Sequence, residues 1–327
     1  MPKTMNIHCE RCGKGFVTAP GLIRHRNRAV PCQAANTVIV PTETKPFLKW
    51  AGGKTQILGQ VLALFPSVIH DYYEPFLGGG SVLIGLLNEM RAGRVTVTGT
   101  IYASDVNSAL VHLYKCIQTN PEDLLTEVQG LMKPSTPADD LGHPILHQET
   151  DYYALRDQYN QLADKTTTKA SALFLYLNKT CFRGLFREGP RGFNVPFGHY
   201  KHPTIADPAL IRHLSVLFKP VVFRVLSFED AISSVTAADF VYADPPYVPV
   251  TATSFVGYTT DGFDKHQVLF DRLKALPCPF LLSNADAPVV KEAFPAPYIV
   301  RTISCRRAIH SKTPDARANE LLITKPT

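Results

Sequence analysis

The sequence predicts an α/β protein with an open, mostly parallel β-sheet, and three features of its 327 residues support this prediction. Short apolar runs typical of buried parallel strands alternate with segments of helical periodicity. One short strand, 72–74, leads into a glycine-rich turn at 78–80 and an apolar helix at 81–90, as in the first βα unit of a Rossmann-like fold. A second apolar run, 239–243, leads into the turn Asp244-Pro245-Pro246-Tyr247. Because open α/β sheets bind ligands at the carboxyl ends of their strands, both turns are candidate parts of a site.

Length and composition fit a soluble globular chain of two domains with a small appendage. The apolar fraction of 45% suffices for a sizeable core, and no apolar run is long enough to span a bilayer. The N-terminus lacks a signal-peptide core, so we expect an intracellular protein without membrane contact, in the nucleus or the cytoplasm. The net charge of +6 permits a polyanionic partner without requiring one. Seven cysteines, an odd number, favour reduced thiols or metal ligands over disulfides.

The N-terminal appendage carries four residues with the spacing of zinc ligands, Cys9, Cys12, His25 and Cys32. Cysteines separated by two residues can form a zinc knuckle, and the histidine fits the helix of a ββα finger. A segment this short cannot bury a core of its own, so the bound ion has to supply the folding energy. The pattern resembles a variant of the common DNA-binding finger, with Cys32 in place of the usual second histidine. Protein contact and non-specific DNA tethering are open alternatives to base reading.

Residues 47–55 open the main part of the chain, and their Gly-Lys-Thr sequence is similar to the end of a phosphate-binding P-loop. That pattern requires glycine at position 48, which is Leu48, and no strand precedes the segment. A P-loop is therefore not expected. Apolar residues at helical spacing over 57–65, ended by Pro66, predict a helix after the segment.

A second strand is predicted at Val95–Ala103, and Asp105 follows it. In Rossmann-like folds an acidic residue after the second strand holds ribose hydroxyls. Asp105 is also suited to cap the next helix, and one residue can do both. The dinucleotide-binding fingerprint is incomplete, because its third glycine would stand at Leu83.

The middle of the chain, about 110–218, is mostly helical and poor in strands, which indicates a domain inserted between two α/β halves. Its last part, 178–201, interleaves arginine and lysine with aromatic residues and glycines. Glycines allow a close approach of the backbone, arginines bind guanine edges or phosphates, and an aromatic ring can fill a gap in a base stack. The composition alone slightly favours a solvated basic loop.

The remaining chain is expected to complete the sheet. Strands are predicted at 221–226, 279–283, 298–303 and 320–324, and helices at 228–235, 264–275 and 287–294. The loop 248–262 is rich in Thr, Ser and Gly and is expected to cover a substrate. A basic loop at 306–312 could meet phosphates.

The turn at 244–247 combines a carboxylate, a stiff pair of prolines and an aromatic face. The proline nitrogens cannot donate hydrogen bonds, and the carbonyls stay free as acceptors. Asp244 and the Pro245 carbonyl could therefore accept both N–H groups of a planar aromatic amine while Tyr247 stacks on its ring. The tetrapeptide alone is equally compatible with an acidic turn whose tyrosine only packs.

Four motifs in this order, Lys49-Trp-Ala-Gly-Gly-Lys54, Glu74-Pro-Phe-x-Gly-x-Gly80, Asp105-x-Asn107 and Asp244-Pro-Pro-Tyr247, resemble those of the Dam-type, or α-group, DNA adenine N6-methyltransferases. The similarity runs from about Phe47 to Lys325. It implies S-adenosylmethionine as cofactor and a Rossmann-like methyltransferase sheet with an inserted, mainly helical target-recognition domain. The implied cofactor contacts are Trp50, Gly53, Lys54, Glu74, Phe76, Gly78, Gly80, Asp105 and Asp244.

The resemblance also implies the chemistry of the site. The implied catalytic residues are Asp244, Pro245, Pro246 and Tyr247, acting on an adenine flipped out of duplex DNA. Adenine N6 is a poor nucleophile, because its lone pair is delocalised into the ring. Two fixed acceptors on its N–H groups would concentrate lone-pair density toward the methyl group that is transferred.

The run 178–201 resembles the target-recognition hairpin of the same family. The implied DNA contacts are Lys49, Phe182, Arg183, Leu185, Arg187 and Pro196. Phe182 matches an aromatic residue that wedges into the duplex, and Lys49 matches a residue that contacts the first guanine of GATC. Leu185, Arg187 and Pro196 match residues that read its later bases. Arg183 departs from the family, which has asparagine beside the wedge, and the hairpin is one residue shorter. Because the other positions match the family, GATC is the expected target despite these two departures.

We expect a zinc finger at 1–35, a linker at 36–45, the cofactor-binding half of the catalytic domain at 46–110, the target-recognition domain at 111–219 and the catalytic half at 220–327. The enzyme is expected to be a monomer. Three alternatives are N4-methylation of cytosine, a catalytically dead finger-tethered DNA-binding protein, and an RNA substrate. Aspartate rather than serine at position 244 argues against cytosine, and the intact Lys54 and Tyr247 argue against a dead domain. The host and the biological role, restriction–modification included, do not follow from the sequence.

Overall fold

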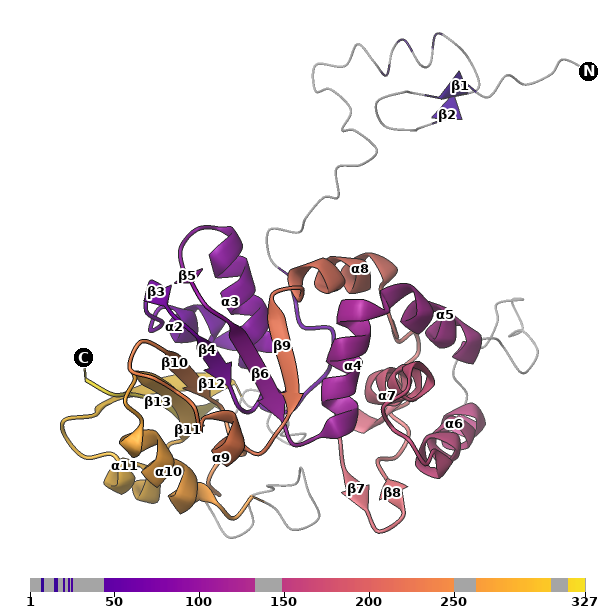
Figure 1. Cartoon of the computed structure of the whole chain (residues 1–327). Coiled ribbons are helices and arrows are strands. Elements are labelled where there is room, and N and C mark those ends of the chain that lie inside the picture. Colours follow the sequence, from indigo (N-terminus) through magenta and orange to yellow (C-terminus); the bar gives the residue numbers. More distant parts are fainter. Residues whose placement is uncertain are drawn as a thin grey trace, which may run out of the picture. The chain divides into compact units, whose positions relative to one another are not determined.

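The protein consists of two compact units, Met1–Glu43 and Thr44–Thr327. The computed structural model describes residues 44–132, 149–249, 263–306 and 317–326 of the second unit, shown in colour in Figure 1. Of the first unit it describes residues 7–8, 15–16, 20, 23 and 25.

The first unit contains a short antiparallel pair of strands, β1 (Ile7–His8) and β2 (Gly15–Phe16). His25 is buried. The predicted zinc ligands Cys9, Cys12 and Cys32 lie outside the described residues, so the zinc site stays a prediction.

Within the described chain, seven strands form the main sheet in the order β12-β13-β11-β10-β4-β6-β9. Their bounds are β4 Tyr72–Glu74, β6 Ile101–Asp105, β9 Val221–Val225, β10 Phe240–Ala243, β11 Phe280–Ala285, β12 Ile299–Arg306 and β13 Arg317–Thr324. Strand β13 runs antiparallel to both of its neighbours, and the other adjacent pairs are parallel. The predicted open, mostly parallel sheet is confirmed. Strands β6 and β9 lie on one side of β4, and β10 and β11 lie on the other side. Open α/β sheets bind ligands where the strand order reverses in this way, which here is between β4 and β10.

Both faces of the sheet are covered, which explains why every residue of the central strands β10 and β11 is buried. Successive side chains alternate between two cores: Phe240 and Tyr242 belong to one, and Val241 and Ala243 to the other. The first core includes side chains of α3 (Ser81–Arg91), α4 (Ser108–Thr119) and α7 (Thr168–Thr180). The second includes those of α9 (Phe228–Ala231), α10 (His266–Ala275) and α11 (Pro288–Ala293).

The prediction of a single strand at 95–103 is wrong. The chain forms β5 (Thr96–Val97), which pairs with β3 (Val68–Ile69) outside the main sheet, and then β6. Gly99 separates the two, and its backbone crosses so close to Asp71 that an added Cβ would lie 2.0 Å from Oδ1. The lack of a side chain at Gly99 therefore permits this crossing.

Several element ends differ from those expected. The helix predicted at 228–235 ends at Ala231, and the last two strands are longer than the predicted 298–303 and 320–324. The helix expected over 57–65 is a 3₁₀ turn, η1 (Lys54–Gln56), and a short α2 (Leu58–Leu62). The loops expected at 248–262 and 306–312 fall largely outside the described residues.

The middle of the chain is mainly helical, as predicted. It contains α4, α5 (Pro121–Leu131), α6 (Glu149–Gln161), α7, α8 (Pro208–Leu217), a short turn η2 (Phe182–Gly184) and a hairpin of β7 (Glu188–Gly189) and β8 (Gly192–Phe193). Helix α4 runs alongside β6 and β9 (Figure 1), so the expected domain boundary at 110/111 falls inside a helix that covers the sheet. None of the helices described is both long and apolar enough to span a membrane.

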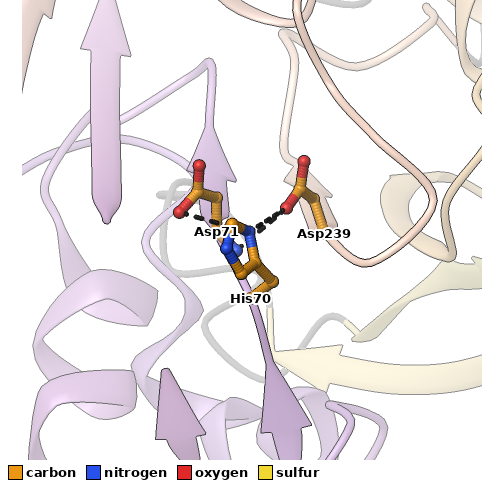
Figure 2. A group of neighbouring side chains, drawn as sticks. All are labelled: His70, Asp71 and Asp239. Atoms are coloured by element: carbon orange, nitrogen blue, oxygen red, sulfur yellow. Dashed lines mark hydrogen bonds and ion pairs between the residues drawn. The ribbon is translucent and has the colours of Figure 1, made fainter. Parts of the chain in front are cut away.

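At the amino ends of β4 and β10, His70, Asp71 and Asp239 bring possible metal-ligand atoms within 4.8 Å of one another (Figure 2). Their carboxylate oxygens already accept hydrogen bonds from the protein. Asp239 accepts from the Asp71 amide at 3.0 Å, from the Thr236 amide at 2.7 Å and from the His70 ring at 3.0 Å. Asp71 accepts from the Thr100 amide at 2.6 Å. We interpret this group as a structural clamp on the strand starts rather than as a metal site.

Candidate active site

A glycine turn joins β4 to α3 and packs tightly on two aromatic side chains. An added Cβ would lie 2.8 Å from Trp50 Cβ at Gly79 and 2.5 Å from the Tyr114 hydroxyl at Gly80, whose φ is +65°. Only glycine fits there without a shift of its surroundings. The N-cap residue of α3, Gly80, has no side chain, and the first turn of the helix holds no acidic residue. The Glu74 carboxyl group accepts a hydrogen bond from the Leu83 amide of that turn. The other amide groups of the turn and the helix dipole favour a negatively charged ligand group.

Asp105 ends β6 beside this turn. Its carboxylate accepts hydrogen bonds from the amides of Gly78 at 3.1 Å and Asn107 at 3.0 Å. The helix α4 is capped by Asn107, which accepts from the Leu110 amide at 2.9 Å, so the expectation that Asp105 caps the helix is wrong. Burial raises the pKa of Asp105, and the backbone hydrogen bonds partly offset that rise. Asp105 thus joins the ends of two neighbouring strands.

Lys54 and Asp244 form a close ion pair at the carboxyl end of β10. The Lys54 ammonium lies 2.7 Å from Asp244 Oδ2 and donates to the Gly52 carbonyl at 2.6 Å. The Asp244 side chain is 19% exposed, but its Oδ1 atom is buried and has no hydrogen-bond partner in the described part of the chain. Burial raises the pKa of Asp244 to about 6, although Lys54 opposes this shift. One carboxylate oxygen is therefore fixed and the other is left as an acceptor.

Glu74 ends β4 next to this pair. Its carboxyl group is buried and accepts a hydrogen bond from the Tyr72 hydroxyl at 2.7 Å. Burial raises the pKa of Glu74 to about 8; the Tyr72 hydrogen bond opposes the shift, and the nearby Asp244 charge adds to it. Glu74 is therefore mostly protonated at neutral pH, which limits the negative charge at the site.

Tyr247 is held on two sides. The Lys54 ammonium lies 4.9 Å from the centroid of its ring, and its hydroxyl donates to Glu320 Oε2 on β13 at 2.8 Å. The next residue, Val248, donates its amide to Asn284 Oδ1 at the end of β11 at 3.0 Å. The sequence-based prediction missed Glu320 and Asn284. A signal existed for Glu320, because it is an acidic residue directly before the apolar run 321–323.

The other predicted cofactor contacts lie around the same edge of the sheet. The Trp50 indole stacks on Phe186 at 5.8 Å between ring centroids, and an added Cβ at Gly78 would lie 3.0 Å from its Cδ1. Gly53 precedes η1 and donates its amide to the Trp50 carbonyl at 3.3 Å. Phe76 stacks on Phe228 at 5.6 Å. The structure thus gathers the predicted cofactor residues where β6, β4 and β10 end.

The residues predicted to contact DNA come from 178–201 and Lys49. The Phe182 ring is 44% exposed, and its amide donates to the Pro196 carbonyl at 2.8 Å. Arg183 has φ of +57°, which is rare for a residue other than glycine, and its guanidinium lies 5.2 Å from the Phe182 ring centroid. Leu185 is half-buried, and Arg187 is exposed and donates to Asn194 Oδ1 at 2.7 Å.

A buried asparagine joins this segment to the start of the cofactor residues. Asn178 accepts from the Lys49 amide at 3.0 Å and donates to the Lys49 carbonyl at 2.7 Å and to the Gly184 carbonyl at 3.3 Å. The Lys49 ammonium lies 3.5 Å from the Tyr200 ring centroid. The predicted wedge, Phe182, and the predicted guanine contact, Lys49, are therefore parts of one hydrogen-bonded assembly.

The strand order and the Asp-Pro-Pro-Tyr turn together define a Rossmann-like methyltransferase that acts on an amine. The family model "D12 class N6 adenine-specific DNA methyltransferase" matches residues 50–306. Type II methyltransferase M.MjaIII of Methanocaldococcus jannaschii is 39% identical over 230 residues, which cover 68% of this chain and 76% of that protein. DNA adenine methylase of Escherichia coli (strain K12) is 30% identical over 276 residues, or 82% of this chain and 90% of its own.

Type II methyltransferase M1.LlaDCHI of Lactococcus lactis subsp. cremoris is 28% identical over 292 residues, covering 86% of this chain and 95% of its own. The chain belongs to the D12-class N6 adenine-specific DNA methyltransferases. It is an enzyme that methylates adenine N6 in DNA, and its family implies S-adenosylmethionine as the methyl donor. The cytosine and dead-domain alternatives are not supported by this family membership.

Proposed function

We propose that the turn at 244–247 binds the target amine of adenine in the sequence GATC. The observation that carries this proposal is that the two oxygens of the Asp244 carboxylate differ. Lys54 binds Oδ2, whereas the buried Oδ1 accepts no hydrogen bond from the residues that the structure describes. One N6–H donates to Oδ1, and the other donates to the Pro245 carbonyl. Tyr247 stacks on the base, which has to leave the duplex to reach this depth.

The two acceptors act by position and charge. They hold the amine with its lone pair directed at the methyl group, and they stabilise the positive charge that develops on N6 during transfer. Transfer would form the N6–C bond while the S–C bond of the sulfonium breaks and leaves a neutral thioether. N6 would then give up a proton, and Asp244 is the carboxylate proposed to contact it. Lys54 keeps Asp244 ionised and correctly oriented before the base arrives.

The residues around the glycine turn fit S-adenosylmethionine, which supplies an activated methyl group on a sulfonium. The start of α3, whose N-cap is a glycine, suits the cofactor's carboxylate, and Asp105 suits its ribose hydroxyls. Further contacts are proposed for Trp50, Gly53, Lys54, Glu74, Phe76, Gly78 and Gly80. The observation that favours this assignment is the steric requirement for glycine at Gly79 and Gly80, which sets the path of the turn.

Duplex DNA is proposed to bind to the helical part, residues 111–219, which we assign as the target-recognition domain. Phe182 enters the base stack, Lys49 meets the first guanine, and Leu185, Arg187 and Pro196 read the later bases. The exposure of Phe182 and Arg187 and the hydrogen bond between Phe182 and Pro196 support this arrangement. A relative named DNA adenine methylase further supports the adenine target.

The proposed N-terminal zinc finger, 1–35, and linker, 36–45, complete the chain. The spacing of Cys9, Cys12, His25 and Cys32 supports zinc binding. The finger is proposed to tether the enzyme to DNA or to a protein, and the enzyme is proposed to act as a monomer.

The target sequence is tested by restriction of plasmid DNA from cells that express the wild-type chain or Asp244→Ala. Enzymes that cut only methylated GATC should digest the wild-type sample, and enzymes that cut only unmethylated GATC should fail on it. The variant should show the reverse pattern. Methylated adenine mapped at nucleotide resolution to another sequence would overturn GATC while leaving adenine methylation intact.

A further inference from the structure

We propose that Glu320 is a positioning residue for methyl transfer, because it fixes the Tyr247 ring in the place where that ring receives the target base. This inference rests on the proposed stacking role of Tyr247. Glu320 acts through Tyr247 and is not itself in contact with the reacting atoms.

The position of Glu320 follows from the one reversed strand of the described sheet. Strand β13 is antiparallel, so its first residues lie at the edge where the parallel strands end. Glu320 stands opposite Ala285, the last residue of β11, and opposite Ile303 of β12. The Glu320 side chain, 73 residues after Tyr247, is thereby brought to the edge of the sheet at which the Asp-Pro-Pro-Tyr turn lies.

The contact with Tyr247 is short and partly shielded from water. The phenolic hydroxyl donates to Glu320 Oε2 at 2.8 Å, and both residues are only partly exposed. A hydrogen bond to a charged acceptor is about twice as strong as one between neutral groups. Burial raises the pKa of Tyr247, and the nearby carboxylates of Asp244 and Glu320 add to this rise, so the hydroxyl keeps its proton and remains a donor.

The hydrogen bond completes a chain of contacts across the site. Glu320 fixes the hydroxyl of Tyr247, Lys54 lies near the face of the Tyr247 ring, and Lys54 also holds Asp244. The stacking surface and the amine acceptor are therefore positioned against each other before the base enters. Such preorganisation raises the rate of the chemical step, because the groups need not be ordered during it.

The test compares Glu320→Ala, Glu320→Gln, Tyr247→Phe and the double variant Tyr247→Phe/Glu320→Ala in the full-length enzyme. Tyr247→Phe removes the donor, Glu320→Ala removes the acceptor, and Glu320→Gln keeps a neutral acceptor. Glu292→Gln, on the exposed face of α11, is the matched control. The measurements are kcat on a duplex with one GATC site, the Kd of S-adenosylmethionine and the melting temperature.

Glu320→Ala and Tyr247→Phe should each lower kcat about tenfold, which corresponds to the loss of one hydrogen bond to a charged group. The double variant should be no slower than the slower single variant, since both changes remove the same contact. Glu320→Gln should retain more activity than Glu320→Ala, and the cofactor Kd should stay within about twofold of the wild type.

Wild-type kcat in Glu320→Ala, or losses that multiply in the double variant, would overturn the inference. A fall in melting temperature with unchanged kcat would assign Glu320 a structural role only and would also overturn it. If Glu320→Ala does not fold, Glu320→Gln and Tyr247→Phe still decide the question. Tyr247→Ala distinguishes a failure of the proposed stacking role from a failure of the Glu320 inference. Full activity in Tyr247→Ala would remove the stacking role itself. Low activity in Tyr247→Ala together with wild-type kcat in the Glu320 variants would remove only the positioning role of Glu320.

Discussion

The Lys54 ammonium lies 2.7 Å from Oδ2 of Asp244, and Oδ1 of the same carboxylate has no hydrogen-bond partner in the described part of the structure. This pairing separates two tasks that a catalytic carboxylate has to perform. The oxygen bound by lysine keeps the group ionised and oriented, and the other oxygen remains available to the substrate amine. This arrangement should make the activity depend on pH.

The activity should depend on the ionisation of Asp244. Burial raises its pKa to about 6, with Lys54 opposing the rise. Only the ionised form can accept from Lys54 at Oδ2 and from the amine at Oδ1 at the same time. We expect kcat/KM to fall as the pH drops below about 6. Lys54→Met removes the opposing charge and should move this acidic limb to higher pH. The pH dependence of kcat/KM for methyl transfer, measured for the wild type and for Lys54→Met, tests both expectations. If kcat/KM of Lys54→Met falls at the same pH as that of the wild type, the proposed role of the ion pair is contradicted.

Glu74 should limit stability at alkaline pH. Its pKa in the folded protein is raised by burial from 4.5 to about 8, so the folded state binds a proton more tightly than the unfolded state does. The resulting stability is present below about pH 4.5 and is lost as the pH rises toward 8. Glu74→Gln, which does not titrate, should therefore raise the melting temperature more at pH 9 than at pH 5. Glu127→Gln, at an exposed site on α5, is the control and should show no such difference.

Arg187 should contribute to sequence choice. Its guanidinium is exposed on the hairpin and oriented by Asn194 at 2.7 Å. Arg187→Ala should lower the preference for GATC over sites with one changed base by about 5- to 100-fold, the range for one lost base contact. Methylation rates on a set of matched duplexes measure this preference. Arg212→Ala removes an exposed arginine that pairs with Glu122, and it should leave the preference unchanged. An equal preference in both variants would contradict the hairpin assignment.

Asp239 should support the fold from the opposite end of the sheet. Burial raises its pKa, but hydrogen bonds from Thr236, Asp71 and His70 outweigh that effect and lower it overall. Asp239→Ala should reduce the free energy of unfolding by about 2–4 kcal/mol, because two backbone amides and the His70 ring lose a charged acceptor that lies in the interior. Urea unfolding at pH 7 measures this, with Asp271→Ala at an exposed site of α10 as control. Since the folded pKa is depressed, the stabilisation by Asp239 should fade as the pH falls below about 4. A wild-type unfolding midpoint in Asp239→Ala would exclude the structural clamp.

The sequence was most informative where local chemistry determines local structure. The apolar strand before Asp244, the glycine turn after β4 and the helix at 81–90 follow from period, burial and turn residues, and the structure confirms them. The two predicted carboxylates, Asp105 and Asp244, also lie at the same edge of the sheet, since parallel strands end together.

Contacts made by residues far apart in the chain could not be predicted in this way. Glu320 reaches Tyr247 because β13 is inserted antiparallel beside β11, and strand order is not encoded in local periodicity. The split of the strand at 95–103 has a similar origin, because it depends on how closely Gly99 passes Asp71. The Lys54–Asp244 pair joins two motifs that are separated by the whole helical part.

The central claim is that Asp244 accepts the amine of the target adenine. Its most direct test is the transfer of radiolabelled methyl groups from S-adenosylmethionine to a GATC duplex by purified wild-type enzyme and Asp244→Ala, together with the duplex Kd of each. We predict that the wild type labels the duplex, and that Asp244→Ala binds it within about threefold of the wild-type Kd but transfers methyl groups at least about 1,000-fold more slowly. Turnover by Asp244→Ala at a rate near that of the wild type would contradict the claim.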